Sequence, residues 1–285
     1  MNTPADKLRT VLQRPGIITM PGCYDAITAK LIEQAGFEVG FMSGFCVSSS
    51  RLGKPDTGLI SYGEMVDQAR NICSTVNIPM FGDGDTGFGN AINVKRTVEG
   101  YAQAGMACIM VEDQVMPKRC GHTKGKDVVS REEAFSRIQA AVDARNEGTD
   151  ILIMARTDSR AIYGLDDAIE RANEFVRIGA DITFVEEVKS VDEMKAYCDS
   201  VPGPKMVNMI EHGNTPIMAP EMLEEIGYKI AVFPLTLLNA SILAMRTSLA
   251  MIRKGQESDN IMDFEGLKSA VGFDEYYDEF DRYNG

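Results

Sequence analysis

Short apolar runs alternate along this chain with longer segments in which apolar residues recur at helical spacing. The runs have the length and continuous apolar character of strands that are buried on both faces, as in a parallel sheet. They cover residues 16–21, 39–43, 79–83, 107–112, 151–156, 182–187, 205–210 and 230–235. The helical patterns lie near residues 26–35, 62–75, 91–104, 131–146, 165–178, 191–199, 220–226 and 238–254. The alternation predicts eight successive strand–helix units.

Eight such units favour an α/β fold of the (β/α)8 TIM-barrel class, which needs about 250 residues. The chain has 285. A doubly wound open sheet would instead favour a glycine-rich phosphate-binding turn after the first strand, and Gly22-Cys23-Tyr24-Asp25 is not of that kind. No linker interrupts the pattern, so we expect one barrel domain over residues 1–285 with a C-terminal helical extension from about 256. This acidic, aromatic extension predicts either a helix that packs on a second subunit or a loosely docked tail.

The composition narrows the class of partner. A formal net charge of -13 and a pI near 4.7 argue against nucleic acid or an acidic membrane. The first residues lack the apolar core of a signal peptide, and no apolar run approaches membrane-spanning length. The six cysteines are scattered without paired spacing, which fits reduced thiols. We therefore expect a cytoplasmic protein that acts on a small molecule.

Acidic residues follow the third and fourth predicted strands, at the end where barrel enzymes carry their active sites. Asp83 and Asp85 are two positions apart, a spacing that places both on one face of a strand. Two converging carboxylates repel each other unless a cation lies between them, and oxygen ligands with room for water favour Mg2+, with Mn2+ as the alternative. Glu112 and Asp113 could join the shell of this metal. A simple Gly/Asp turn is the other interpretation.

A second group of polar residues follows the next three strands. Arg156 ends the fifth strand, and its planar guanidinium matches a carboxylate bidentately. It could bind a substrate carboxylate or simply pair with Asp158. Glu186 ends the sixth strand and Asn208 lies on the seventh. These residues extend the candidate site around the barrel mouth.

The segment 116–126, between the fourth strand and the following helix, concentrates further chemistry. It carries four cations, a thiol and one of the two histidines, namely Lys118, Arg119, Lys124, Lys126, Cys120 and His122. A loop of this length between barrel elements is usually a lid or a binding loop. A basic lid with a thiol predicts an anionic substrate and an acid–base or nucleophilic role for Cys120. His122 is equally compatible with an ordinary polar loop residue.

Six ordered motifs carry a family resemblance. They are Phe41-Met42-Ser43-Gly44-Phe45, Gly53-Lys54-Pro55-Asp56, Gly82-Asp83-Gly84-Asp85-Thr86-Gly87-Phe88-Gly89, Val111-Glu112-Asp113-Gln114, Lys118-Arg119-Cys120-Gly121-His122 and Ala155-Arg156-Thr157-Asp158. Together they resemble the isocitrate lyase / phosphoenolpyruvate mutase superfamily over about residues 10–255, and the motif with the Cys resembles its lyase branch. The resemblance implies a Mg2+-dependent barrel enzyme, usually a homotetramer whose eighth helix is exchanged between neighbouring subunits.

The resemblance also implies a role for each matching residue. Asp83 and Asp85 would hold the Mg2+, with Glu112 and Asp56 in its direct or water-mediated shell. Cys120 on the mobile lid would donate a proton.

The same resemblance implies the contacts to the substrate. Ser43-Gly44 and Arg156 would bind the 2-oxo or 2-hydroxy carboxylate end, and Gly121-His122 would bind the far carboxylate. Glu186 and Asn208 would complete the pocket. Of these two, Glu186 would be a catalytic residue.

Two apolar positions bear on the choice of substrate. Ile210 follows the strand-seven Asn where methylisocitrate lyases typically have Thr, and Phe233 lies near the end of the eighth strand. An unpaired carboxylate against these side chains would cost several kcal/mol, whereas a methyl group would gain about 1 kcal/mol. These positions favour retro-aldol cleavage of an alkylmalate such as 2,3-dimethylmalate to pyruvate and propanoate. A 2-methylisocitrate lyase, an oxaloacetate hydrolase and a non-catalytic dicarboxylate-binding barrel are the alternatives. Phe41 replaces the Tyr of methylisocitrate lyases two residues before Ser43, which excludes a phenolic role there.

Overall fold

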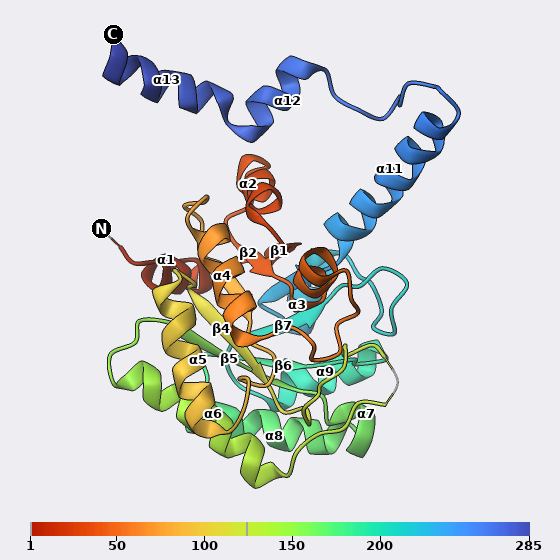
Figure 1. Cartoon of the computed structure of the whole chain (residues 1–285). Coiled ribbons are helices and arrows are strands. Elements are labelled where there is room, and N and C mark those ends of the chain that lie inside the picture. The colour runs from red at the N-terminus through yellow and green to blue at the C-terminus, as the bar shows by residue number, and fades with distance from the viewer. Residues whose placement is uncertain (1, 124) are drawn as a thin grey trace. The chain divides into compact units, whose positions relative to one another are not determined.

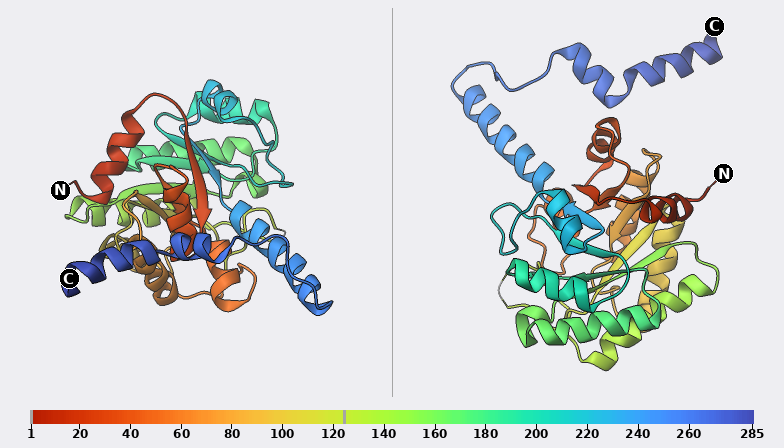
Figure 2. Two further views of the ribbon diagram at one scale, coloured as in Figure 1. Left: turned by 90° about the horizontal axis from the view of Figure 1, so that it is seen from above. Right: turned by 180° about the vertical axis from the view of Figure 1, so that it is seen from behind.

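The computed structural model describes residues 2–123 and 125–285, and it contains a closed barrel of parallel strands surrounded by helices (Figures 1 and 2). Each strand pairs with the next in the sequence, and β1 pairs with β8 to close the barrel. The strands are β1 (Ile18–Cys23), β2 (Gly40–Met42), β3 (Met80–Asp83), β4 (Cys108–Glu112), β5 (Leu152–Thr157), β6 (Ile182–Val185), β7 (Lys205–Asn208) and β8 (Ile230–Phe233). The predicted TIM-barrel class is confirmed.

Helices follow the strands in the predicted order. Those that the sequence pattern predicted are α2 (Ala26–Gln34), α4 (Tyr62–Cys73), α5 (Ala91–Gln103), α6 (Arg131–Asn146), α8 (Leu165–Ile178), α9 (Val191–Ser200), α10 (Pro220–Ile226) and α11 (Thr236–Arg253). The structure adds α1 (Pro4–Gln13), α3 (Gly44–Val47), the π-helical segment η1 (Ser48–Leu52) and α7 (Arg160–Tyr163). Within the described ranges, no helix is long and apolar enough to cross a membrane.

Helix α1 closes the amino-terminal end of the barrel. It begins at a capping box in which Thr3 accepts from the N–H of Asp6, with Pro4 in the first turn. Its apolar face, Leu8 included, belongs to the same buried cluster as the interior side chains of the strands, such as Phe81 and Met154. Since this end is filled, ligands must enter at the opposite end, where the strands terminate.

The eighth strand corrects one prediction. The interior cluster contains Ile230 and Val232 of β8, whereas Ala231 and Phe233 pack in the outer cluster beneath the helices. Successive strand residues point to opposite faces, so Phe233 points away from the barrel axis. The prediction that Phe233 contacts the substrate is therefore wrong.

The chain divides into two compact units, of which the first ends at Leu237 and the second is Leu238–Gly285. This division lies within α11, earlier than the extension expected from about residue 256. The second unit also contains α12 (Phe264–Val271) and α13 (Phe273–Asn284). These two helices have no buried residues. The exchange of a helix between subunits stays a prediction.

Candidate active site

A small cavity lies at the carboxyl ends of the strands, beneath the described residues of segment 116–126, which we call the lid. The space within it that can hold the centre of a water molecule is about 40 Å3, enough for a few waters. Most of the predicted site residues line it, namely Ser43, Asp56, Asp83, Cys120, Gly121, His122, Arg156, Glu186, Asn208 and Ile210. Gly44, Asp85, Glu112 and Phe233 do not. The lid therefore lies close over the barrel mouth.

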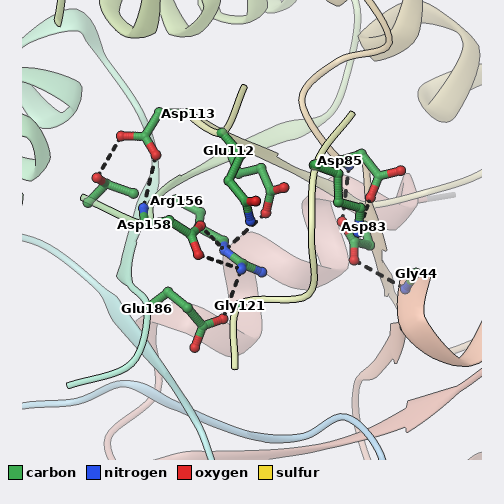
Figure 3. Close-up of polar contacts among 12 residues, drawn as sticks. Gly44, Asp83, Asp85, Glu112, Asp113, Gly121, Arg156, Asp158 and Glu186 are labelled. Atoms are coloured by element: carbon green, nitrogen blue, oxygen red, sulfur yellow. Dashed lines mark hydrogen bonds and ion pairs between the residues drawn. The ribbon is translucent and has the colours of Figure 1, made fainter. Parts of the chain in front are cut away.

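A turn after β3 brings Asp83 and Asp85 close together. The strand ends at Asp83, and Asp85 has a left-handed φ of 47°, so strand alternation is not what brings the two together. Asp83 accepts from the backbone N–H of Asp85 and from that of Gly44, each at 3.1 Å (Figure 3). A Cβ on Gly44 would lie 2.6 Å from Asp83 Oδ2, so only glycine fits there. Because the Gly44 N–H donates to Asp83, this group orients a carboxylate rather than a substrate.

Lys118 of the lid reaches into this acidic group. Its Nζ lies 2.6 Å from Asp56 Oδ1 and 2.7 Å from Asp85 Oδ1, and all three side chains are buried. Burial disfavours the ammonium, but the charges of Asp85, Asp83 and Asp56 outweigh it and raise the pKa of Lys118. Burial raises the pKa of Asp85 to about 7 even beside this lysine. Three carboxyl groups, those of Asp56, Asp83 and Asp85, thus surround one buried ammonium group.

The acidic residues fit a further cation. Asp85 Oδ2 and Glu112 Oε1 are buried and have no hydrogen-bond partner among the described residues. In the part of the chain that the structure describes, no group of three or more His, Cys, Asp or Glu side chains is arranged so that it could hold a metal ion by itself. Mg2+ is usually held by one or two carboxylates and keeps several waters. The donor set therefore suits such an ion better than one that needs a cage of protein ligands.

Arg156 lies among three carboxylates on neighbouring strands (Figure 3). Its Nε donates to Asp158 Oδ2 at 2.8 Å and its Nη2 to Asp158 Oδ1 at 3.1 Å, which is the pairing that the sequence left open. Its Nε also lies 3.1 Å from Glu112 Oε2, and its Nη2 lies 3.1 Å from Glu186 Oε2. Burial disfavours the guanidinium, but Asp158, Glu112 and Glu186 raise the pKa of Arg156, so it stays charged at the cavity wall.

The lid contacts the barrel directly on this side. A Cβ on Gly121 would lie 2.5 Å from Arg156 Nη2 and 2.6 Å from Glu186 Cγ, so the lid backbone packs against that ion pair. Lys126 Nζ lies 2.8 Å from Glu187 Oε2 and 3.3 Å from Asp158 Oδ1, and it also donates to the Gly121 carbonyl. Lys124, another predicted lid cation, lies outside the described residues.

The two lysines change the interpretation of the lid. Sequence reasoning expected its cations to attract an anionic substrate. Lys118 and Lys126 instead pair with carboxylates at the strand ends, one on either side of Cys120. Both residues are functional candidates that the sequence could not place, because their partners are remote in the chain.

His122, Glu186 and Asn208 form a polar chain across the cavity floor. Glu186 accepts from Asn208 Nδ2 at 2.9 Å, and His122 Nε2 lies 3.1 Å from Glu186 Oε1. Since His122 Nδ1 accepts from the N–H of Asn214, Nε2 is the donor to Glu186. Burial opposes ionisation of Glu186, but Arg156 and His122 hold its pKa well below the usual range. These contacts fix the position of the Glu186 carboxylate, and its catalytic role stays a prediction.

Cys120 is half-buried and faces the cavity. Burial raises the pKa of its thiol to about 11, so the sulfur carries its proton at neutral pH. A thiol in this state can donate a proton to a strongly basic carbon. It is a poor nucleophile, because the thiolate is the reactive form.

Apart from Arg119, the remaining cavity wall is apolar. It includes Ile210, as predicted, together with Phe41, Phe45, Met110, Phe184, Met206, Pro234 and Leu235. Pro234 and Leu235 follow β8 and take the place that the sequence assigned to Phe233. The sequence carries no signal for this difference, because the β8 run is apolar on both faces.

Barrel enzymes carry their active sites at this end of the sheet, and the buried charges and thiol gathered here mark this protein as an enzyme of that class. The chain belongs to the family described as phosphoenolpyruvate phosphomutase, whose model matches residues 8–253. The superfamily resemblance seen in the six motifs is thereby confirmed.

Several relatives share nearly the whole chain. A 2,3-dimethylmalate lyase of Eubacterium barkeri is 42% identical, and the match covers 98% of this chain and 94% of that protein. A chloroplastic carboxyvinyl-carboxyphosphonate phosphorylmutase of Arabidopsis thaliana is 41% identical, and the match covers 98% of this chain and 84% of that protein. A 2-methylisocitrate lyase of Aeropyrum pernix is 41% identical, and the match covers 92% of this chain and 84% of that protein. The expectation of a lyase-type enzyme is confirmed.

Solved structures agree with this assignment. An oxaloacetate acetylhydrolase with the inhibitor 3,3-difluorooxalacetate matches with a TM-score of 0.95 at 32% identity, covering 99% of this chain and 98% of that one. A 2,3-dimethylmalate lyase matches with a TM-score of 0.94 at 35% identity, covering 100% and 97%. A phosphonopyruvate hydrolase in complex with oxalate and Mg2+ matches with a TM-score of 0.87 at 28% identity, covering 100% of both.

Proposed function

We propose that this protein is a Mg2+-dependent carbon–carbon lyase that cleaves a 2-hydroxy dicarboxylate with small alkyl substituents. The preferred substrate is 2,3-dimethylmalate, which would yield pyruvate and propanoate. The observation that carries the proposal is one cavity lined by Arg156, by the protonated thiol of Cys120 and by an apolar wall that includes Ile210. The similarity to the Eubacterium barkeri enzyme supports the choice of substrate.

Asp85 and Asp83 would hold the Mg2+, with Asp56 and Glu112 close by. The unpartnered oxygens of Asp85 and Glu112 support this assignment, as does the Mg2+ in the related phosphonopyruvate hydrolase. When bound, the ion would lower the pKa of a substrate hydroxyl and stabilise negative charge on oxygen.

Residues of the chain bind the two carboxylates of the substrate and donate the proton. Arg156 orients the carboxylate next to the hydroxyl, because its charge is fixed by three neighbouring acids. His122, held by Glu186, and the backbone of Gly121 bring the lid onto the far carboxylate. As the C2–C3 bond breaks, the Cys120 thiol gives its proton to the carbon atom that leaves, and the proton released from the hydroxyl is balanced by the one that returns the thiolate to the thiol. The closed lid excludes the water that would compete as a proton donor.

The apolar wall favours the alkylmalate over its alternatives. A third carboxylate, as in 2-methylisocitrate, would lie against side chains such as Ile210, Phe45 and Leu235. Burying that charge without a partner costs several kcal/mol, whereas a methyl group gains about 1 kcal/mol. Oxaloacetate lacks the methyl groups and would leave this wall uncovered. Its hydrolysis is the second candidate, because the oxaloacetate acetylhydrolase matches so closely in structure.

A product assay tests the proposal. The purified protein is incubated with Mg2+ and, separately, 2,3-dimethylmalate, 2-methylisocitrate and oxaloacetate, and products are identified by mass spectrometry. We expect pyruvate and propanoate from 2,3-dimethylmalate at the highest kcat/KM, and no turnover after chelator treatment until Mg2+ is restored. Faster turnover of 2-methylisocitrate or oxaloacetate would overturn the choice of substrate. Full activity without a divalent ion would overturn the metal assignment.

A further inference from the structure

The two ends of the lid are joined by a short antiparallel ladder. The N–H of Val129 donates to the carbonyl of Asp113, and that of Val115 donates to the carbonyl of Asp127, each at 2.9 Å. Between these bonds Gln114 faces Val128 as an isolated bridge. The base of the lid is therefore fixed, and contacts inside the loop add to the ion pairs that its tip makes with the barrel.

The side chain of Gln114 makes such a contact. Its Nε2 donates to the carbonyl of Arg119 at 2.8 Å, and the N–H of Arg119 donates to its Oε1 at 2.9 Å. The side chain is buried, and its own backbone carbonyl accepts from Arg137 of α6 at 2.8 Å. An amide fixed to the barrel thus pairs with both peptide groups of one lid residue.

This pairing acts on the residue that precedes the thiol. Cys120 follows Arg119 directly, and the Cys120 carbonyl accepts from the N–H and the hydroxyl of Thr123 at 2.9 and 2.8 Å. The backbone of Cys120 is therefore held on both sides, by Gln114 before it and by the Thr123 turn after it. The direction of its side chain into the cavity follows from these two constraints.

We propose that Gln114 is a positioning residue that holds the lid closed and aims the Cys120 thiol at the substrate. The proposal rests on the proposed function, in which Cys120 donates the proton. A primary amide offers a donor and an acceptor side by side, as a peptide group requires. Glutamate at this position would repel the Arg119 carbonyl, and leucine would leave both peptide groups without partners. When the lid opens, both hydrogen bonds are lost together.

The first test measures access to Cys120 without any substrate. Gln114→Leu and Gln114→Glu are compared with the wild-type protein by the rate of Cys120 alkylation with iodoacetamide, followed by peptide mass spectrometry. We expect about a tenfold faster reaction in both variants, because each hydrogen bond contributes a modest but measurable share of lid closure. The buried Cys23, Cys46 and Cys108 serve as internal controls, since they stay protected from alkylation as long as the barrel is folded.

Gln139→Leu is the matched control. Gln139 is exposed on α6 and contacts Asp143 four residues away, so the same substitution there should leave Cys120 alkylation unchanged. Should Gln114→Leu unfold the barrel, Gln114→Glu keeps the size and one of the two bonds and decides the question alone. Unchanged Cys120 alkylation in a folded Gln114→Glu variant overturns the proposal.

The second test separates positioning from general stability. We expect both Gln114 variants to lower kcat on 2,3-dimethylmalate by about tenfold or more with a smaller rise in KM, because Gln114 does not line the cavity and affects the substrate only through the lid. A change in KM alone would overturn the role in aiming the thiol. If the wild-type protein turns over none of the substrates while Cys120 alkylation responds as expected, the proposed function fails and the lid contact stands.

Discussion

Cys120 lies between two lysines whose ammonium groups are already paired. Lys118 contacts Asp56 and Asp85, and Lys126 contacts Glu187. These two ammonium groups pair with carboxylates, and Arg119 and Arg156 are the further cations that line the cavity. At this scale the chemistry of the site follows from burial: the same burial that isolates the ion pairs keeps the Cys120 sulfur protonated.

Replacing Cys120 by serine tests whether the thiol is the proton donor. A serine hydroxyl is a far weaker acid of similar size, so we expect kcat to fall by about 10² to 10⁴ while oxalate binding changes little. Steady-state kinetics and calorimetry with oxalate in Mg2+ buffer give the two quantities. Cys73→Ser, at the end of α4, is the control and should keep full activity. Wild-type turnover in Cys120→Ser would exclude the thiol and favour a different donor.

The raised pKa of Cys120 predicts how its reactivity depends on pH. Burial raises this pKa from 9.0 to about 11, with the charges of Asp56 and Glu186 acting in the same direction. Only the thiolate reacts, so a raised pKa lowers reactivity at a given pH; at pH 8 the thiolate fraction is about a thousandth, against about a tenth for a pKa of 9. We expect the alkylation rate to rise about tenfold per pH unit from 7 to 10. A rate that levels off between pH 9 and 10, as expected for the unperturbed thiol of urea-unfolded protein, would contradict this.

At the scale of elements, the alternation of apolar runs and helical patterns was enough to predict the barrel. Periodicity is a local property, and each predicted strand lies within a few residues of an observed one. The same pattern could not orient Phe233, because a run that is apolar on both faces hides which residues point inward. It also could not find Gln114 or Lys118, since their partners are a peptide group and acids elsewhere in the chain. Residue types at strand ends were predictable, but their pairings were not.

The contact between the lid and β6 gives a prediction at this scale. In Gly121→Ala the new Cβ would lie 2.5 to 2.7 Å from Arg156 and Glu186, whose positions are fixed by other ion pairs. The lid must then stay partly open, so we expect kcat/KM to fall by about 100-fold, as a displacement near 1 Å typically causes. Gly63→Ala on α4, where the nearest atom is 4.0 Å away, is the control. Normal activity in Gly121→Ala would show that the lid works in a different position.

At the scale of the whole molecule, the second unit exposes more apolar surface than an isolated chain should. Large exposed side chains recur along α11, α12 and α13: Leu243, Met245, Leu249, Ile252, Phe264, Leu267, Val271, Phe273, Tyr276, Tyr277, Phe280 and Tyr283. Large exposed apolar patches usually mark protein interfaces, and side chains of this kind recur on all three helices. This pattern is consistent with the predicted homotetramer, and residues 254–285 lie beyond the region matched by the family.

The aromatic side chains of α13 give the last prediction. If they pack against other subunits, replacing Tyr276 and Phe280 by serine removes large apolar contacts while the barrel, a separate compact unit, stays folded. We expect sedimentation velocity to show the wild-type protein at about four times the chain mass of 31.3 kDa and the variant in smaller species. Glu279→Gln on the same helix removes a charge that, among the described residues, forms an ion pair with the neighbouring Arg282 alone, so it should assemble normally. A monomeric wild-type protein would exclude the tetramer, and a fully assembled double variant would place the interface on α11 or α12 instead.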